Sequence, residues 1–181
     1  MPLSASEVIK FWFEEITLRQ QYQKDPEFDR LITSRFLPLH QQARSCELYP
    51  WRDHPLEALA EVIILDQFSR NIFRDKAEAF AHDALALALS QEAIRRNFHK
   101  QLTSEQQAFL YMPFMHSESA EIHEIALSLF GQPSLEDKLK FELQHKAIID
   151  KFGRYPHRNA ILGRESTEEE LAFLQQPGSS F

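Results

Sequence analysis

The stretch from Asp150 to Thr167 holds the densest group of side chains that could do chemistry. It has no acidic residue between Asp150 and Glu165, although the whole chain carries a formal net charge of −7 at pH 7. Its basic residues are Lys151, Arg154, His157, Arg158 and Arg164. Guanidinium groups are planar forks that bind carboxylates and phosphates. Their partners are therefore either carboxylates elsewhere in the fold or an anionic ligand, and the sequence leaves both open.

A second polar motif, His116-Ser117-Glu118, places a possible base, a hydroxyl and a carboxylate in succession. We take His116 and Glu118 as candidate catalytic residues, with His116 as a possible proton carrier. The GxSxG motif of a serine-hydrolase elbow is absent from the sequence, which argues against a nucleophilic serine. Whether the protein is an enzyme is left open.

The sequence contains only fragments of metal and cofactor motifs. His123-Glu124 begins like the zinc motif HExxH, but its fifth position is Leu127. By ligand type, His116, Glu118 and His145 could hold zinc or iron, but their spacing does not support such a site. The chain also lacks the GxGxxG and GxxxxGK motifs of dinucleotide and P-loop sites. We therefore predict neither a metal nor a cofactor.

The elements that must position these residues are expected to be helices. Only 4 glycines stand against 15 phenylalanines in 181 residues, which favours aromatic packing between helices over hairpin turns. Capping residues and apolar spacing predict eight helices. They run from Ser4 to Ile16, from Asp25 to about Pro38, from His54 to Asn71, from Asp83 to Asn97, from Thr103 to Pro113, from Glu118 to Phe130, from after Ser134 to Phe152, and from Thr167 to Leu174.

The sequence also predicts how four of these helices are bent or ended. Pro38 should kink or end the second helix, and Pro113 should bend the fifth beside His116. Gly131 and Gly153 should end the sixth and seventh helices, Gly131 through a left-handed turn. Four antiparallel hairpins in a right-handed, tetratricopeptide-like array are the predicted arrangement of this single all-α domain, residues 1–181. The tetratricopeptide repeat signature itself is absent from the sequence.

The composition indicates the class of protein and its cellular compartment. The fractions of 43% hydrophobic and 26% charged residues are those of a soluble globular protein. Cys46 is the only cysteine, so no intramolecular disulfide is expected. We see no secretory leader and no stretch near the roughly 18 apolar residues of a membrane span. The acidic balance argues against a nucleic-acid footprint. These features predict a cytoplasmic protein without a membrane or nucleic-acid partner.

Four longer motifs resemble a known family. They are FWFEE at 11–15, LDQFSRNIFR at 65–74, FLYMPFMHSE at 109–118 and FGRYPHRNAILGREST at 152–167, and they are similar to the bacterial family called domain of unknown function 924. The resemblance implies an all-helical, tetratricopeptide-like fold and a cytosolic setting, with no established activity. One departure is Ser69, where many relatives have proline.

The resemblance also marks characteristic polar positions. These are Asp66, Gln67, Arg70, Asn71, Asp83, His116, Ser117, Glu118, His145, Arg154, His157, Arg158, Asn159, Arg164 and Ser166. Asp66 and Arg70 are four residues apart on one helix, so they could simply form a helix-end ion pair. As ligand-binding candidates we take Asp66, Arg70, Asn71, His145, Arg154, His157, Arg158, Asn159 and Arg164.

Two hypotheses follow. In the first, these motifs converge from helix ends on one pocket that binds a small anionic metabolite. In the second, the helices form a protein-interaction scaffold for a peptide or helix, which would leave an apolar groove of several hundred Å² exposed.

Overall fold

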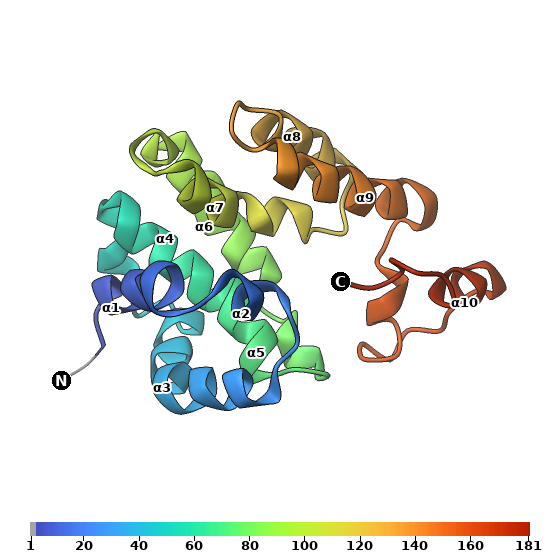
Figure 1. The fold of residues 1–181 in the computed structure, drawn as a ribbon, viewed down its shortest axis with the longest axis horizontal. Coiled ribbons are helices and arrows are strands. Elements are labelled where there is room, and N and C mark those ends of the chain that lie inside the picture. The colour runs from blue at the N-terminus through green and yellow to red at the C-terminus, as the bar shows by residue number, and fades with distance from the viewer. Residues whose placement is uncertain (1–2) are drawn as a thin grey trace. The chain divides into compact units, whose positions relative to one another are not determined.

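The computed structural model describes residues 3–181, and every regular element within them is helical. In chain order these are α1 (Ala5–Lys10) with the π-helical turn Phe11–Glu15, α2 (Leu18–Tyr22), α3 (Pro26–Arg44), the 3₁₀ turn Tyr49–Asp53, α4 (Pro55–Ile63) with the π-helical turn Ile64–Phe68 and α5 (Ser69–Ile72), the 3₁₀ turn Ala77–Ala79, α6 (Asp83–Arg95), the 3₁₀ turn Phe98–Gln101, α7 (Ser104–Met115), α8 (Ala120–Phe130), α9 (Glu136–Phe152), the 3₁₀ turn Pro156–Arg158 and α10 (Glu168–Leu174) (Figure 1). The predicted all-α class is confirmed.

The chain divides into two compact units, which we describe separately. The first unit comprises the chain up to Arg74 together with Glu78–Pro113, and the second comprises Asp75–Ala77 and Phe114–Phe181. The single domain and the tetratricopeptide-like array stay predictions.

Four predicted caps are found at the starts of helices, at Ser4, Asp25, Thr103 and Thr167. The Asp25 carboxylate accepts from the backbone N–H groups of Glu27 and Phe28, with Pro26 in the first helical position. Thr167 and Glu170 form a reciprocal capping box at α10. These side chains satisfy backbone donors that the first turn of a helix leaves unpaired. The local sequence therefore determines where these helices begin.

α8 ends at Phe130 as predicted, but two details expected at helix ends are wrong, and one short helix was not predicted. α3 does not end at Pro38 but continues to Arg44. Pro38 and Ser34, whose carbonyl loses its partner, both lie on the exposed face, where water can replace the lost bond. Gly131 follows α8 with φ −72°, so the left-handed turn expected there is absent. α2 starts with a Thr17/Gln20 capping box that sequence reading overlooked.

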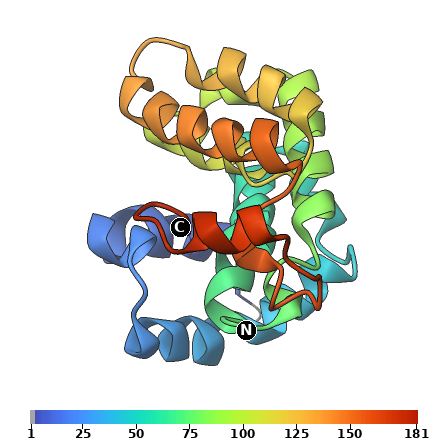
Figure 2. The same ribbon diagram turned by 90° about the vertical axis from the view of Figure 1, so that its right-hand side faces the viewer.

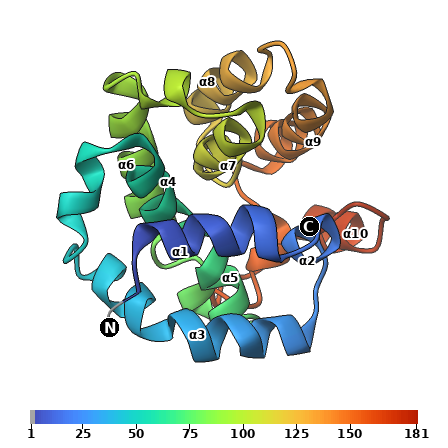
Figure 3. The same cartoon turned by 60° about the vertical axis from the view of Figure 1, so that its left-hand side comes forward.

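The first unit is built around α4 and its continuation through α5. Every residue from Ala58 to Ser69 is buried, so this rod is apolar on all sides except at a few polar positions. α1 and α6 pack on α4, and α3 packs on α5 (Figure 3). The rings of Phe11 and Phe36 have centroids 4.8 Å apart, and those of Phe36 and Phe68 are 4.7 Å apart. An aromatic core therefore holds these helices together.

The second unit starts with α8 and α9, which pack side by side as a hairpin (Figures 1 and 2). Gly153 ends α9 with φ +68°, as predicted. This left-handed turn directs the chain into the Pro156–Arg158 turn and then α10. Ile148, Ile149 and Tyr155 are buried together there, with Phe152 and Phe173 packed against them.

None of the helices within residues 3–181 combines the length and hydropathy needed to cross a bilayer.

Candidate functional site

The predicted site residues fall in both units. Asp66, Arg70 and Asn71 belong to the first unit. The others belong to the second and are His116, Glu118, His145, Arg154, His157, Arg158, Asn159 and Arg164. The predicted convergence of the two sets stays a prediction, and each set is described within its own unit.

In the first unit, the π-helical turn Ile64–Phe68 buries Asp66. Arg70 donates to the Asp66 backbone carbonyl at 2.6 Å and lies 3.4 Å from its carboxylate. The guanidinium also donates to both carboxylate oxygens of Asp83, each at 3.0 Å. The predicted Asp66–Arg70 pair therefore exists and extends to Asp83. Asn71 instead donates to Asp29 at 2.9 Å.

Two arginines of the 150–167 segment have carboxylate partners. Arg164 donates to both oxygens of Glu118 at 2.7 and 2.9 Å, and Arg154 donates to both oxygens of Glu170 at 2.7 and 2.8 Å. Hydrogen bonds from Arg154 lower the pKa of Glu170 to about 2. Burial opposes ionisation of Glu118, yet the hydrogen bonds from Arg164 and the Tyr155 N–H leave its pKa below the ordinary value. Both glutamates are thus anionic at neutral pH.

Glu170 is a site residue that sequence reasoning missed. Its position was assigned only to the α10 capping box, which it does form with Thr167. The same carboxylate also binds Arg154 and accepts from Asn159 at 3.3 Å. Asn159 in turn accepts from Arg164 at 3.0 Å, so a buried amide links the two ion pairs. The predicted ligand-binding residues Arg154, Asn159 and Arg164 therefore hold the 154–164 segment in place through hydrogen bonds within the protein.

Arg158 contacts an aromatic ring and a backbone carbonyl. It ends the Pro156–Arg158 turn with only 5% of its surface exposed. Its guanidinium lies over the Tyr155 ring, 4.7 Å from the centroid, and donates to the His116 backbone carbonyl at 3.1 Å. Arg158 therefore joins the 150–167 segment to the predicted His116-Ser117-Glu118 motif.

His145, on α9, is buried and neutral. Its Nδ1–H donates to the Phe141 carbonyl at 2.7 Å, one helical turn earlier, because a carbonyl oxygen can only accept. Its pKa is lowered to about 3, chiefly by burial and to a smaller extent by His116, His123 and His157, although the bond to Phe141 acts in the opposite direction. The other ring nitrogen, Nε2, consequently carries a lone pair. His145 is thus a fixed acceptor within a group of histidines.

A buried His123–Glu142 pair was also missed. His123 Nδ1 lies 2.6 Å from Glu142 Oε1, and His123 Nε2 lies 2.9 Å from the Ser117 carbonyl and 3.2 Å from the Tyr155 hydroxyl. Burial raises the pKa of Glu142, which favours its protonated form. The pair ties α8, α9 and the 117–118 loop together. Its signal in the sequence, a histidine on an otherwise apolar helix face, was considered only as a failed zinc motif.

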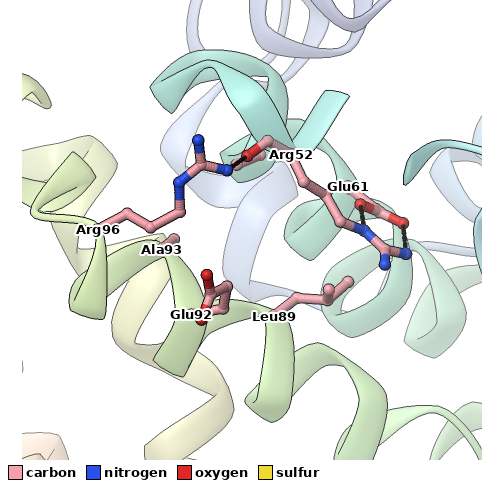
Figure 4. A pocket seen from close by; sticks show the side chains of 7 residues that line it. Arg52, Glu61, Leu89, Glu92, Ala93 and Arg96 are labelled. Atoms are coloured by element: carbon pink, nitrogen blue, oxygen red, sulfur yellow. Dashed lines mark hydrogen bonds and ion pairs between the residues drawn. The ribbon is translucent and has the colours of Figure 1, made fainter. Parts of the chain in front are cut away.

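A shallow hollow open to solvent lies in the first unit (Figure 4). Arg52 and Glu61 form a bidentate pair at its wall, at 2.7 and 2.8 Å, and Arg96 donates to the Arg52 carbonyl. None of the predicted site residues lines it. Within residues 3–181, no three His, Cys, Asp or Glu side chains are grouped so as to hold a metal ion.

Comparisons place the chain among known proteins. No curated protein matches it. A solved protein of unknown function from Agrobacterium tumefaciens is 36% identical, with a TM-score of 0.90 over 94% of this chain and 96% of that one. The model of the family described as "Bacterial protein of unknown function (DUF924)" matches residues 8–178. That match spans nearly the whole sequence, and the chain therefore belongs to this family of bacterial proteins of unknown function.

Proposed function

We propose that the second unit binds a small anionic molecule at a site formed by His116, His145, His157 and Arg158. The observation that carries this proposal is His145: a buried, neutral imidazole whose Nδ1 is committed to the Phe141 carbonyl. The helix thereby presents Nε2 as an acceptor for a hydroxyl or N–H of a ligand. Functional sites are where such strongly perturbed pKa values gather.

Arg158 supplies the positive charge. A guanidinium in a poorly solvated setting attracts an anion more strongly than one in water, because the local dielectric constant is lower. The position of Arg158 is set by the neighbouring backbone, since Glu118 accepts from the Tyr155 N–H at 2.7 Å and is itself clamped by Arg164. In this proposal the Arg164–Glu118 pair orients the binding residue and does not contact the ligand.

The roles of the two predicted catalytic residues differ. Glu118 is stabilised as an anion by Arg164, so it is a poor proton donor at neutral pH. The role of proton carrier therefore falls to His116, because the lowered pKa of His145 keeps that imidazole unprotonated at neutral pH. The contacts do not point to a particular reaction, and the proposal is one of binding.

The scaffold alternative receives less support. No described helix carries more than two large apolar side chains that are exposed. Trp12, Tyr111 and Tyr155 are fully buried, Trp51 is half-buried, and Tyr22 and Tyr49 are exposed. A peptide-binding groove would instead gather such residues on one surface.

A thermal-shift comparison tests the proposal with inorganic phosphate and succinate as probes. We expect the unfolding temperature of the wild type to rise by a few degrees at saturating probe, because binding to the folded state stabilises it. The rise should be lost in Arg158→Ala and in His145→Phe, which keeps a ring but removes Nε2. It should persist in Arg95→Ala, a control that removes an exposed arginine of the first unit.

Arg158→Lys serves as a second variant in case Arg158→Ala fails to fold. It keeps the positive charge but lacks the planar guanidinium. A wild type indifferent to both probes, or stabilisation that survives in Arg158→Ala and His145→Phe, would overturn the proposal.

A further inference from the structure

The last residues of the sequence fold back onto the histidine group. After α10 ends at Leu174, the chain reverses at Gly178, whose φ of +78° suits glycine. Ser179 is buried, and its hydroxyl donates to the Leu174 carbonyl at 3.2 Å. The red end of the ribbon in Figure 1 accordingly returns beside the Pro156–Arg158 turn. This return carries Phe181 to the rings of α9 and the turn.

Three rings surround Phe181. Its centroid lies 3.6 Å from that of His145, 4.7 Å from that of His157 and 5.2 Å from that of Tyr155. The planes of Tyr155 and Phe181 meet at 86° and those of His157 and Phe181 at 72°, which are edge-to-face arrangements that aromatic rings favour. The three partners thus form a slot shaped for a flat ring.

Phe181 is held in this slot only loosely. The residue is 54% exposed, whereas the three residues whose rings receive it are buried or half-buried. The tail is fastened by the Ser179 hydroxyl and the backbone bond from the Ser179 N–H to Gln176. A side chain that leaves half its surface in water is a replaceable occupant and contributes little to the core.

We propose that His145, Tyr155 and His157 form a binding slot for a planar aromatic ring, which Phe181 fills until a ligand ring displaces it. This rests on the proposed function in that it names the ligand class of the same site, an aromatic or heteroaromatic acid. The ring enters the slot beside His145 Nε2, and the anionic group binds Arg158. Phe181 lowers the apparent affinity by the fraction of molecules in which it occupies the slot.

Phenol and cyclohexanol provide matched neutral probes, since both have a six-membered ring and a hydroxyl but only phenol is flat. Binding is followed by NMR through the ring signals of His145, assigned by their loss in His145→Phe. We expect phenol to bind about two- to tenfold more tightly to Phe181→Ala than to wild type, because an aromatic competitor is removed. Leu171→Ala is the control, since it removes an apolar side chain from α10 at a residue that is 53% exposed, close to the 54% of Phe181.

Phe181→Leu keeps apolar bulk without a flat ring and should give an intermediate affinity. Unchanged or weaker phenol binding in Phe181→Ala would show that Phe181 is a permanent part of the structure that ligands do not displace, and it would overturn the proposal. An equal gain for cyclohexanol would show a hollow without preference for flat rings, which also overturns it. Because phenol is uncharged, its result is independent of the results with phosphate and succinate. If phenol binds but phosphate and succinate do not, the proposed function is rejected and the proposed ring-binding slot is retained.

Discussion

Two histidines, His40 and His145, are buried in an uncharged form. His40 in the first unit is fully buried, and its Nε2 lies 2.7 Å from the Ser69 hydroxyl. That hydroxyl donates to the Leu65 carbonyl, so His40 Nε2–H must be the donor to Ser69. Ser69, the one departure noted from the resembling family, thus has a defined role in this chain. His40 and His145 are both buried and neutral, and each donates one ring N–H to a neighbour.

His40 predicts a loss of stability in mild acid. Burial, with smaller contributions from His82 and Arg44, lowers its pKa from 6.5 to about 4. The unfolded chain therefore binds more protons than the folded one between these values, and stability falls as the pH drops through this window. The loss from His40 should reach about 3 kcal/mol near pH 4.

Urea unfolding at pH 7 and near pH 4.5 measures this loss in wild type and His40→Gln, which keeps a donor for Ser69 but does not titrate. The variant should show a smaller drop, and His54→Gln, at an exposed helix cap, should behave as wild type. An identical drop in His40→Gln and wild type would exclude His40 as the source.

At the scale of elements, local chemistry determined the helix starts, while tertiary packing determined the exceptions. Asp25, Thr103 and Thr167 cap helices because a nearby side chain satisfies the first backbone donors. The π-helical turn that buries Asp66 could not be predicted, because it depends on the packing of α4–α5 and leaves no local signal. Glu170 was recognised only as a cap, because its pairing with Arg154 bridges residues 16 apart.

The Arg164–Glu118 pair should couple energetically. Each side chain is 25% exposed, so the pair is partly desolvated, and removing one partner leaves the other incompletely solvated. In a cycle of Arg164→Ala and Glu118→Gln, we expect a coupling energy of about 1–3 kcal/mol from urea unfolding. The exposed pair Arg30–Glu27, at 3.8 Å, is the control and should show no measurable coupling. Additive losses at Arg164 and Glu118 would mean that the two side chains do not interact in solution.

At the scale of the whole molecule, composition and motifs were sufficient for the fold class and the family. Few glycines and many phenylalanines indicated helices packed through aromatic side chains, as in the Phe11–Phe36–Phe68 cluster. The sequence also identified Glu118 and Arg164 as interesting residues, but not as partners, since they are 46 positions apart. His123, Glu142 and the return of Phe181 to His145 depend on three-dimensional packing and could not be assigned from spacing.

The most direct test of the proposed site is a titration of the wild type with benzoate, which combines a flat ring with a carboxylate. NMR follows the ring signals of the chain's 8 histidines. We expect saturable shifts at His116, His145 and His157, much weaker binding in Arg158→Lys, and no shift at His54 and His99 of the first unit. If His145 does not respond, or if His54 and His99 shift as strongly, benzoate does not bind at this site and the proposed function is wrong.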